Sequence, residues 1–260
     1  MKNISYVVFI LALLAGCNDQ EPTLNRPADV KLKAVQTIGK GWTYQESYEY
    51  HSDLRINKIQ WERNTPYTTR GLEKYVYDNN LRLSGMIREM TGIVAEEILY
   101  RYDGLQIVEA SSYSNGIKES NTIYYYNPAG QLVKSVLYRR DPLANEFTIE
   151  GEIQYTYHWH GNVYEVKQFV FDSQQSEMKL HTTRTYPAYL LDRIAVLDSY
   201  PSLPTVRLQK NLPEKYILTT PSSQVSVEFA YRWMPDGRLL DRIVNLLDDS
   251  TEHTIYTFDQ

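Results

Sequence analysis

The chain has 260 residues, of which 42% are hydrophobic, 23% charged and 13% aromatic, and its mean hydropathy is −0.48. With 23 Tyr, 6 Phe and 4 Trp it has ample surface to bury, which excludes a disordered chain. The net charge of −5 leaves no basic surface for phosphates and excludes a typical nucleic-acid binder, and the single Cys excludes a disulfide framework and a Cys-rich zinc site.

Residues 1–16 have the organisation of an export signal. Lys2 supplies one positive charge, and the apolar stretch 4–14 is too short to remain as a membrane-spanning helix. The stretch runs into Leu-Ala-Gly-Cys, which ends at Cys17, the only Cys of the chain. This segment resembles the lipobox of bacterial lipoproteins. The resemblance implies cleavage before Cys17, lipidation of its sulfur and amine, and attachment to a membrane; a plain secretory signal is the alternative.

Residues 17–29 are interpreted as the lipidated Cys and a flexible tether, because residues 18–27 contain one Leu, two Pro and no hydrophobic periodicity. Asp19 and Glu21, directly after the Cys, are similar to the surface-export signals of Bacteroidota-type lipoproteins. We therefore expect a cell-envelope location, as an outer-membrane lipoprotein. The sequence leaves open whether the protein faces the periplasm or the cell surface.

An internal repeat organises the rest of the chain. Two aromatic residues separated by one position are followed by Asp, Asn or His, then a short turn, then a run of Leu, Ile or Val. Copies begin at residues 48, 75, 100, 124, 155 and 229, and a half-copy begins at residue 256. The wide gap before residue 229 predicts a degenerate copy at residues 186–194, because residues 190–194 are identical in sequence to residues 239–243.

Each unit has the pattern of a β-hairpin. Alternate residues of a strand point to opposite faces, and in residues 147–159 the odd positions are mostly aromatic or aliphatic while the even positions are polar. Asn-Pro-Ala-Gly at 127–130 and Pro-Asp-Gly at 235–237 supply turn residues. The predicted fold is therefore all-β, an antiparallel hairpin meander whose sheet curls into a half-barrel or forms a sandwich.

We expect one domain over residues 30–260, because neighbouring units share a continuous core. Residues 199–223 hold four of the 11 prolines, and they predict a long, partly extended crossover that interrupts the meander.

The units resemble the YD repeats of RHS-type proteins, most closely in the copies that begin at Tyr124 and Phe229. Short arrays behind a lipobox resemble the uncharacterised lipoproteins of Bacteroidota that carry such repeats. The resemblance covers nearly all of residues 48–259 and implies β architecture and life at the cell surface or in the periplasm, but no reaction. Large arrays of this family close into shells, and we expect six or seven copies to be too few to enclose anything.

The His pair is the first candidate for chemistry. His158 and His160 would project to one side of a strand, where a third ligand could complete a zinc site. The repeat register instead aligns His158 with Asp78, Asp103 and Asn127, which open turns. We therefore interpret the pair as turn residues, and we predict no metal and no cofactor. The acidic cluster at residues 248–253 lacks the spacing and the Gly of a calcium loop.

Glu150 and Glu152 would share one face of a strand, at a spacing that a glycoside hydrolase tolerates. Nothing in the sequence indicates a cleft or a raised pKa there, and the common nucleophile, zinc and nucleotide motifs are missing from the sequence. The sequence therefore predicts a protein that is not an enzyme. A glycoside hydrolase is the third hypothesis, and it predicts paired buried carboxylates that face one cleft.

Aromatic side chains are the remaining candidates. Trp42, Trp61, Tyr125, Tyr138 and Trp159 are the predicted ligand-binding residues, because exposed aromatic rings can stack on sugars and Tyr combines an apolar body with a polar tip. The expected function is a lipid-anchored binding or interaction module for a glycan or an envelope protein. The alternative is a carrier of lipid or another hydrophobic ligand, with a cavity lined by Val, Ile, Leu and Phe rather than by Tyr.

Overall fold

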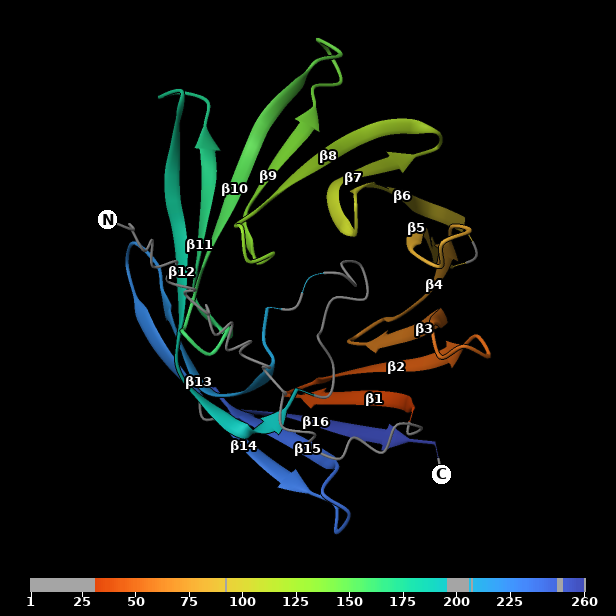
Figure 1. Cartoon of the computed structure of the whole chain (residues 1–260), viewed down its shortest axis with the longest axis vertical. Helices are drawn as coiled ribbons and strands as arrows, with labels where there is room; N and C mark the ends of the chain where they lie inside the picture. Colours follow the sequence, from red (N-terminus) through yellow and green to blue (C-terminus); the bar gives the residue numbers. More distant parts are fainter. Residues whose placement is uncertain (1–30, 92, 196–205, 207, 247–249, 260) are drawn as a thin grey trace, which may run out of the picture. The chain divides into compact units, whose positions relative to one another are not determined.

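The computed structural model describes residues 31–91, 93–195, 206, 208–246 and 250–259. The chain divides into two units, Met1–Val30 and Lys31–Gln260, and the described residues belong to the second. Sixteen strands form one antiparallel sheet that closes on itself as a barrel (Figure 1). Nowhere in the described part of the chain is there a helix with the length and apolar character needed to cross a bilayer.

The strands follow one another around the barrel in chain order, and each pairs with its predecessor and its successor. Their bounds are β1 Leu32–Gly39, β2 Trp42–Tyr50, β3 Ile56–Asn64, β4 Thr68–Tyr77, β5 Leu83–Met90, β6 Ile93–Asp103, β7 Gln106–Ser114, β8 Ile117–Tyr126, β9 Leu132–Arg140, β10 Phe147–Tyr157, β11 Val163–Asp172, β12 Glu177–Ile194, β13 Asn211–Thr219, β14 Gln224–Trp233, β15 Leu239–Asn245 and β16 Thr251–Phe258.

The predicted all-β meander is confirmed, whereas the half-barrel and the sandwich are wrong. The sheet closes because β1 pairs with β16, with Val35 opposite Tyr256 and Thr37 opposite Thr254. The first strand therefore belongs to the same sheet as the repeats. The expectation that so few copies enclose nothing is also wrong, since the hairpins complete a ring around a lumen.

The predicted crossover at residues 199–223 is in part a strand of the barrel. β13 pairs with β12 and with β14, and Thr220 begins the turn that leads into β14. Pro213 lies opposite Tyr189, next to a register shift in the β12–β13 ladder. Pro has no N–H to donate, and an irregular ladder tolerates that loss. Residues 199–205 and 207 of the predicted crossover lie outside the described residues.

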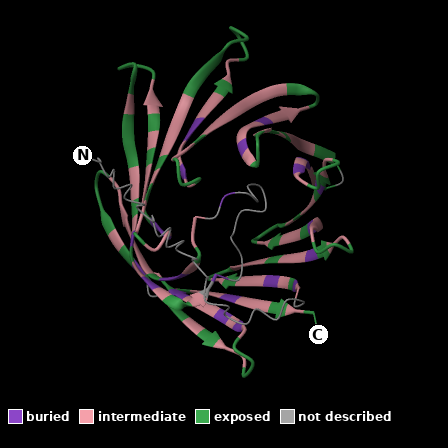
Figure 2. Cartoon of the chain, in the orientation of Figure 1, coloured by how far each residue is buried: buried purple, intermediate pink, exposed green. Residues whose placement is uncertain are grey.

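Apolar side chains gather on the lumen side of the sheet. Val35, Tyr48, Ile59, Tyr75 and Met86 come from β1 to β5 in turn, and they belong to one buried cluster. Two smaller clusters lie around β11–β12 and around β13–β15. Most exposed residues are found at the hairpin tips and on the outer side (Figure 2). The period-two pattern of the sequence therefore arises because alternate residues of each strand face the lumen and the outside of the barrel.

One turn geometry follows five of the aromatic pairs, whereas the pair at Tyr100 and Tyr102 leads into a two-residue turn between Asp103 and Gln106. In the turn that Asp78 opens, its N–H donates to the carbonyl of Arg82 at 2.8 Å, and its own carbonyl accepts from Leu81 at 2.9 Å. The same two bonds recur in the turns that open at His51, Asn127, His158 and Met234. The fourth turn residue has positive φ in every case. It is Gly at 130, 161 and 237, and Leu at 54 and 81.

The second aromatic residue of the unit fastens each hairpin. Tyr126 on β8 donates its hydroxyl to the carbonyl of Ile107 on β7 at 2.7 Å. Each tyrosine in this role bonds to the strand that precedes its own. The seven bonds are Tyr50–Leu32, Tyr77–Ile56, Tyr102–Leu83, Tyr126–Ile107, Tyr157–Leu132, Tyr189–Val163 and Tyr231–Pro213. Tyr189 makes this bond from the predicted degenerate copy, and Phe258 stands at the equivalent position of the last hairpin.

Candidate functional site

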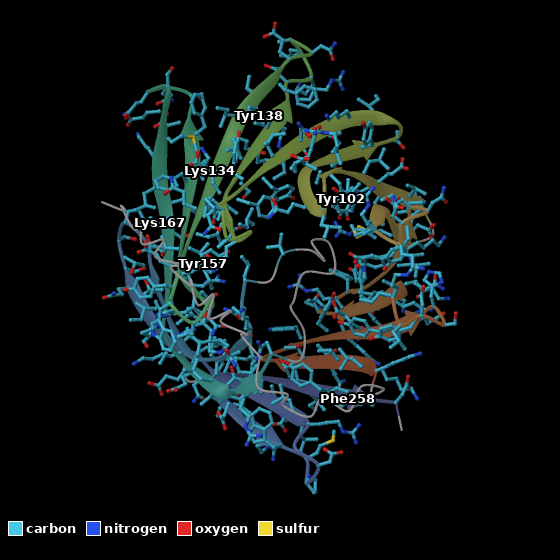
Figure 3. The ribbon with its side chains drawn as sticks, viewed as in Figure 1. Tyr102, Lys134, Tyr138, Tyr157, Lys167 and Phe258 are labelled. Carbon is cyan, nitrogen blue, oxygen red and sulfur yellow. The ribbon has the colours of Figure 1, made fainter. Side chains whose placement is uncertain are left out.

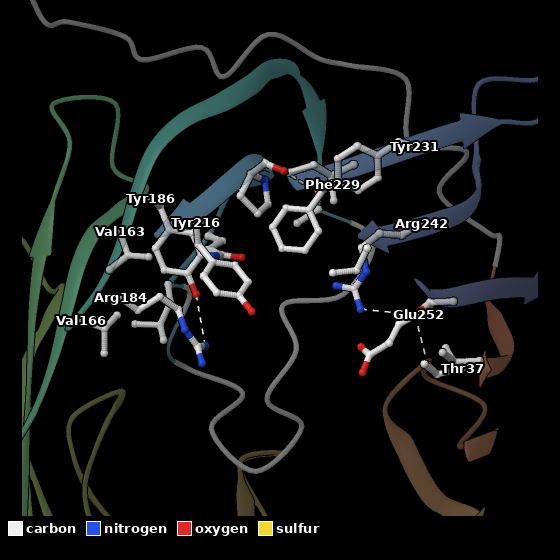
Figure 4. Close-up of a pocket in the computed structure, with 18 of the residues that line it drawn as sticks. Thr37, Val163, Val166, Arg184, Tyr186, Tyr216, Phe229, Tyr231, Arg242 and Glu252 are labelled. Atoms are coloured by element: carbon white, nitrogen blue, oxygen red, sulfur yellow. Dashed lines mark hydrogen bonds between the residues drawn. The ribbon is translucent and has the colours of Figure 1, made fainter. Parts of the chain in front are cut away.

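A cavity of about 740 Å³ lies in the lumen (Figure 4). Its lining residues come from β1, β2 and β10 to β16, together with the segment 208–213. This volume lies within the range of small-molecule binding sites, about 300–1,000 Å³. We therefore treat the cavity as the candidate site.

The end of the cavity nearest the repeat turns is apolar. Val163, at the start of β11, and Leu239, at the start of β15, are each only 1% exposed. Leu208, in the segment before β13, and Leu212, the second residue of β13, also line this end, which we call the floor of the cavity. A ligand that reaches the floor therefore meets aliphatic side chains.

Asn162 fixes the segment that closes the floor. This buried side chain accepts hydrogen bonds from the N–H groups of Lys210 and Asn211, at 2.6 and 2.9 Å. Its amide donates to Asn211 Oδ1 at 2.9 Å, and Val163 N–H donates to the carbonyl of Leu208 at 2.8 Å. The turn between β10 and β11 thereby holds residues 208–211 against the barrel wall.

The other end of the cavity is polar. Thr37, Gln168, Thr182 and Glu252 lie on the halves of their strands that point away from the repeat turns. The Thr37 and Thr254 hydroxyls lie 3.2 Å apart. The cavity therefore changes from apolar to polar along the barrel axis.

Four side chains from consecutive strands form a row on one wall, which we call the Arg–aromatic row: Arg184 on β12, Tyr216 on β13, Phe229 on β14 and Arg242 on β15 (Figure 4). Arg184 lies 5.0 Å from the centroid of the Tyr216 ring, and Arg242 lies 5.6 Å from that of Phe229. The two rings are 5.7 Å apart. The row thus offers an aromatic surface with a guanidinium at each end, held by cation–π contact.

A pair of tyrosines on β2 adds hydroxyl groups to the cavity. Tyr44 donates to Glu46 Oε1 at 2.8 Å, and Tyr48 donates to the other carboxylate oxygen. Burial, with the Glu46 charge as the next cause, raises the pKa of both tyrosines well above the ordinary value. Both hydroxyls therefore stay protonated, and the carboxylate of Glu46 is held by two donors.

Two of the predicted binding residues cover glycines. Trp42 lies over Gly39 and Trp61 lies over Gly71, each on the neighbouring strand, so that a Cβ on Gly71 would lie 2.2 Å from the Trp61 ring. An aromatic ring commonly shields a strand glycine in this way. Neither Trp lines the cavity.

The other three predicted residues lie elsewhere. Tyr125 and Tyr138 are on the outer face of β8 and β9, and the Lys134 ammonium lies 4.8 Å from the centroid of the Tyr125 ring. Trp159 is 92% exposed in the turn between β10 and β11. The structure does not bring the five predicted residues together, and their binding role stays a prediction. Cys17 lies outside the described residues.

The His pair occupies the repeat turn, as the register indicates. The two rings are stacked, with centroids 4.7 Å apart, and His158 Nε2 lies 2.8 Å from the carbonyl oxygen of Tyr186. The amide of Asn162 donates to His160 Nδ1 at 2.8 Å, and burial together with His158 lowers the pKa of His160. Within the described residues, no group of three His, Cys, Asp or Glu side chains is placed to hold a metal ion.

The predicted carboxylate pair is engaged with basic and amide groups. Glu150 accepts from Arg139 at 2.7 Å, and Glu152 lies 3.7 Å from Lys134 and accepts from Gln154 at 2.6 Å. Neither lines the cavity. In the acidic cluster near the C-terminus, residues 248 and 249 lie outside the described residues, whereas Glu252 faces the lumen.

Sequence reasoning missed the charged members of the site. The alternation in β14 places Phe229 and Tyr231 on the apolar face, so their lumen position could be predicted. Arg184 lies between two threonines and Arg242 lies between Asp241 and Ile243, so no contrast between the two faces marks either arginine as inward-facing.

Comparison with known proteins relates the fold to that of other barrels. No family model matches the sequence, and no curated protein matches it. A solved porin-like protein from Bacteroides uniformis is similar, with a TM-score of 0.59 and 12% identity over 88% of this chain and 98% of that chain. A porin-like protein from Bacteroides vulgatus has a TM-score of 0.51 and 15% identity over 89% of this chain and 99% of its own. At these identities the likeness shows the closed β-barrel fold alone.

Proposed function

We propose that this chain is a non-enzymatic binding barrel whose lumen holds a saccharide. The observation that carries the proposal is the cavity wall, in which seven tyrosines and Phe229 lie among polar, charged and aliphatic side chains. A sugar ring presents C–H faces that aromatic rings can cover and hydroxyls that polar groups can bond. Tyr suits such a ligand because it combines an apolar body with a polar tip.

The outer face supports a barrel that works in water. Membrane-spanning barrels carry an apolar band on the outside, and a charge on that face is costly. Here cross-strand and same-strand ion pairs follow the outer face around the sheet. Lys167, labelled in Figure 3, is an example: it lies opposite Gln154, whereas the next residue, Gln168, lines the cavity. These pairs are Lys58–Glu49, Arg70–Glu62, Lys74–Glu89, Arg101–Glu109, Lys134–Glu152, Lys167–Glu165 and Arg232–Asp241. We therefore propose that this chain shares the barrel fold of the porin-like proteins but does not form a pore through a membrane.

The proposed location is the cell envelope, through lipid on Cys17. The basis is the lipobox-like sequence together with the tether at residues 17–29. Kinship with the YD-repeat lipoproteins of Bacteroidota belongs to the same proposal and is supported by the recurring unit.

The test is a glycan array probed with the purified protein, followed by calorimetric titration of the saccharides that bind. Phe229→Ala removes an aromatic surface from the cavity wall, and we expect it to weaken binding about tenfold or more, a loss of about 1.4 kcal/mol or more. Tyr125→Ala on the outer face is the matched control and should leave the affinity unchanged. Failure of every saccharide to bind, or an equal loss in both variants, would refute the proposal.

A carrier of a hydrophobic ligand is the second candidate, because the floor around Val163, Leu208, Leu212 and Leu239 is aliphatic. This reading predicts that a fluorescent fatty acid binds at micromolar concentration and that saccharides do not displace it. Binding of saccharides alone would exclude the carrier.

A further inference from the structure

Arg242 leaves part of its hydrogen-bonding capacity unused. Its Nη2 lies 3.3 Å from Thr254 Oγ1, whereas Nε is buried and has no partner. No carboxylate of the described residues lies within ion-pair distance of this guanidinium. A guanidinium carries five N–H donors in a planar fork, and a buried donor without an acceptor is costly. Nε itself is too deeply buried for a ligand to reach, so an acceptor from outside the chain would bind the guanidinium through its Nη groups, at the cavity that Arg242 lines.

Glu252, which lines the same cavity, has a carboxylate whose capacity to accept hydrogen bonds is unused. Its carboxylate has no hydrogen-bond or ion-pair partner among the described residues, and Figure 4 shows its side chain near Arg242 at the cavity. A ligand that satisfies both groups must accept hydrogen bonds at one point and donate them at another. A fatty acid has a carboxylate for Arg242, but its alkyl chain offers no donor to Glu252.

We propose that the lumen recognises an acidic saccharide, whose carboxylate is bound by Arg242 while a sugar ring covers Tyr216 and Phe229. Sugar hydroxyls then donate to Glu252. Arg is suited to this role because its fork matches the two oxygens of a carboxylate. This inference rests on the proposed saccharide site and adds the charge of the ligand.

The test compares two disaccharides that differ only at C6. Calorimetry measures the binding of α-1,4-linked digalacturonic acid, which carries carboxylates, and of α-1,4-linked galactobiose, which carries CH₂OH groups in their place. We expect the acid to bind about 10- to 100-fold more tightly, as expected for a charge-assisted hydrogen bond. The preference should shrink as salt is added, because ions screen the interaction.

Variants then assign the preference. Arg242→Gln should remove most of it by weakening the acid about 10- to 100-fold, a much larger loss than galactobiose suffers. Arg242→Lys keeps the charge without the fork and should retain part of the preference. Arg70→Gln, on the outer face, is the matched control and should behave like the unmodified protein. Thermal melts of all three variants show whether the barrel is intact.

The outcomes separate this inference from the function beneath it. Equal affinity for both disaccharides, with no effect of Arg242→Gln, would overturn the acidic ligand and leave the saccharide site standing. If neither disaccharide binds but dodecanoate does, both the acidic saccharide and the saccharide function are refuted, and the carrier takes their place.

Discussion

The bond from Tyr126 to Ile107 offers a sharp test of how the repeat stabilises the barrel. Tyr126→Phe removes only the hydroxyl that donates to the Ile107 carbonyl at 2.7 Å. Because Ile107 is 0% exposed, water cannot replace the lost donor. A hydrogen bond contributes about 0.5–1.5 kcal/mol and an unsatisfied buried acceptor costs about 1–3 kcal/mol, so we expect a loss of about 1.5–2 kcal/mol in the free energy of unfolding.

The adjacent residue supplies the control. Tyr125 points to the outer face, is 42% exposed, and has no hydroxyl bond to a described residue. Tyr125→Phe should therefore change the free energy of unfolding by less than about 0.5 kcal/mol. Urea unfolding followed by circular dichroism measures both variants, and Tyr126→Phe should also lower Tm by about 3–8 °C, at about 2–4 °C per kcal/mol for a domain of this size. Equal effects of the two substitutions would show that the hydroxyl bond is not what fastens the hairpin.

Three further predictions concern a turn, an ion pair and the N-terminal segment. Leu81 has φ of 64° where Gly237 has 84°. In urea titrations, Leu81→Gly should raise the free energy of unfolding by about 0.5–1 kcal/mol and Gly237→Leu should lower it by about 1–2 kcal/mol; a loss of stability in Leu81→Gly, or a gain in Gly237→Leu, would contradict the turn analysis. Asp241 is 2% exposed, and its hydrogen bond from Arg232 holds its pKa below the ordinary value, so the stabilisation is complete above the unfolded pKa of about 3.9 and is lost as pH falls through the lower folded pKa. Asp241→Asn should therefore destabilise the barrel at pH 7 by about 1–3 kcal/mol and flatten the decline of stability below a pH of about 4. An unchanged acid profile would exclude this ion pair as the source of that decline. Mass spectrometry of the exported protein should find acyl chains on Cys17 and none in Cys17→Ser; an unmodified Cys17 would refute the anchor.

The strands and turns were predictable because both leave local signals. Period-two alternation in segments such as 147–159 reflects the difference between the lumen and the outer face, which each strand experiences in the same way. Turn residues such as Asn127 and Gly130 are selected by local backbone geometry. Closure was not predictable, because the pairing of β1 with β16 joins residues more than 200 positions apart and β1 carries no copy of the aromatic unit.

The site was harder to predict than the fold, because the same residue type serves two purposes. Trp42 and Trp61 are prominent in the sequence, yet they cover Gly39 and Gly71 on neighbouring strands. Nothing local distinguishes such a ring from one that binds a ligand. The cavity is assembled from strands at both ends of the chain, so its lining becomes visible only once the barrel is closed.

The central claim is that the lumen, and not the outer face, is the binding surface. The most direct measurement is ¹⁹F NMR of the purified protein labelled with fluorotyrosine, with signals assigned by Tyr→Phe variants and digalacturonic acid as the titrant. The account predicts that the signals of Tyr186 and Tyr216, which line the cavity, shift on binding while those of Tyr125 and Tyr138 stay in place. Shifts confined to Tyr125 and Tyr138, or no shift at any tyrosine, would contradict it.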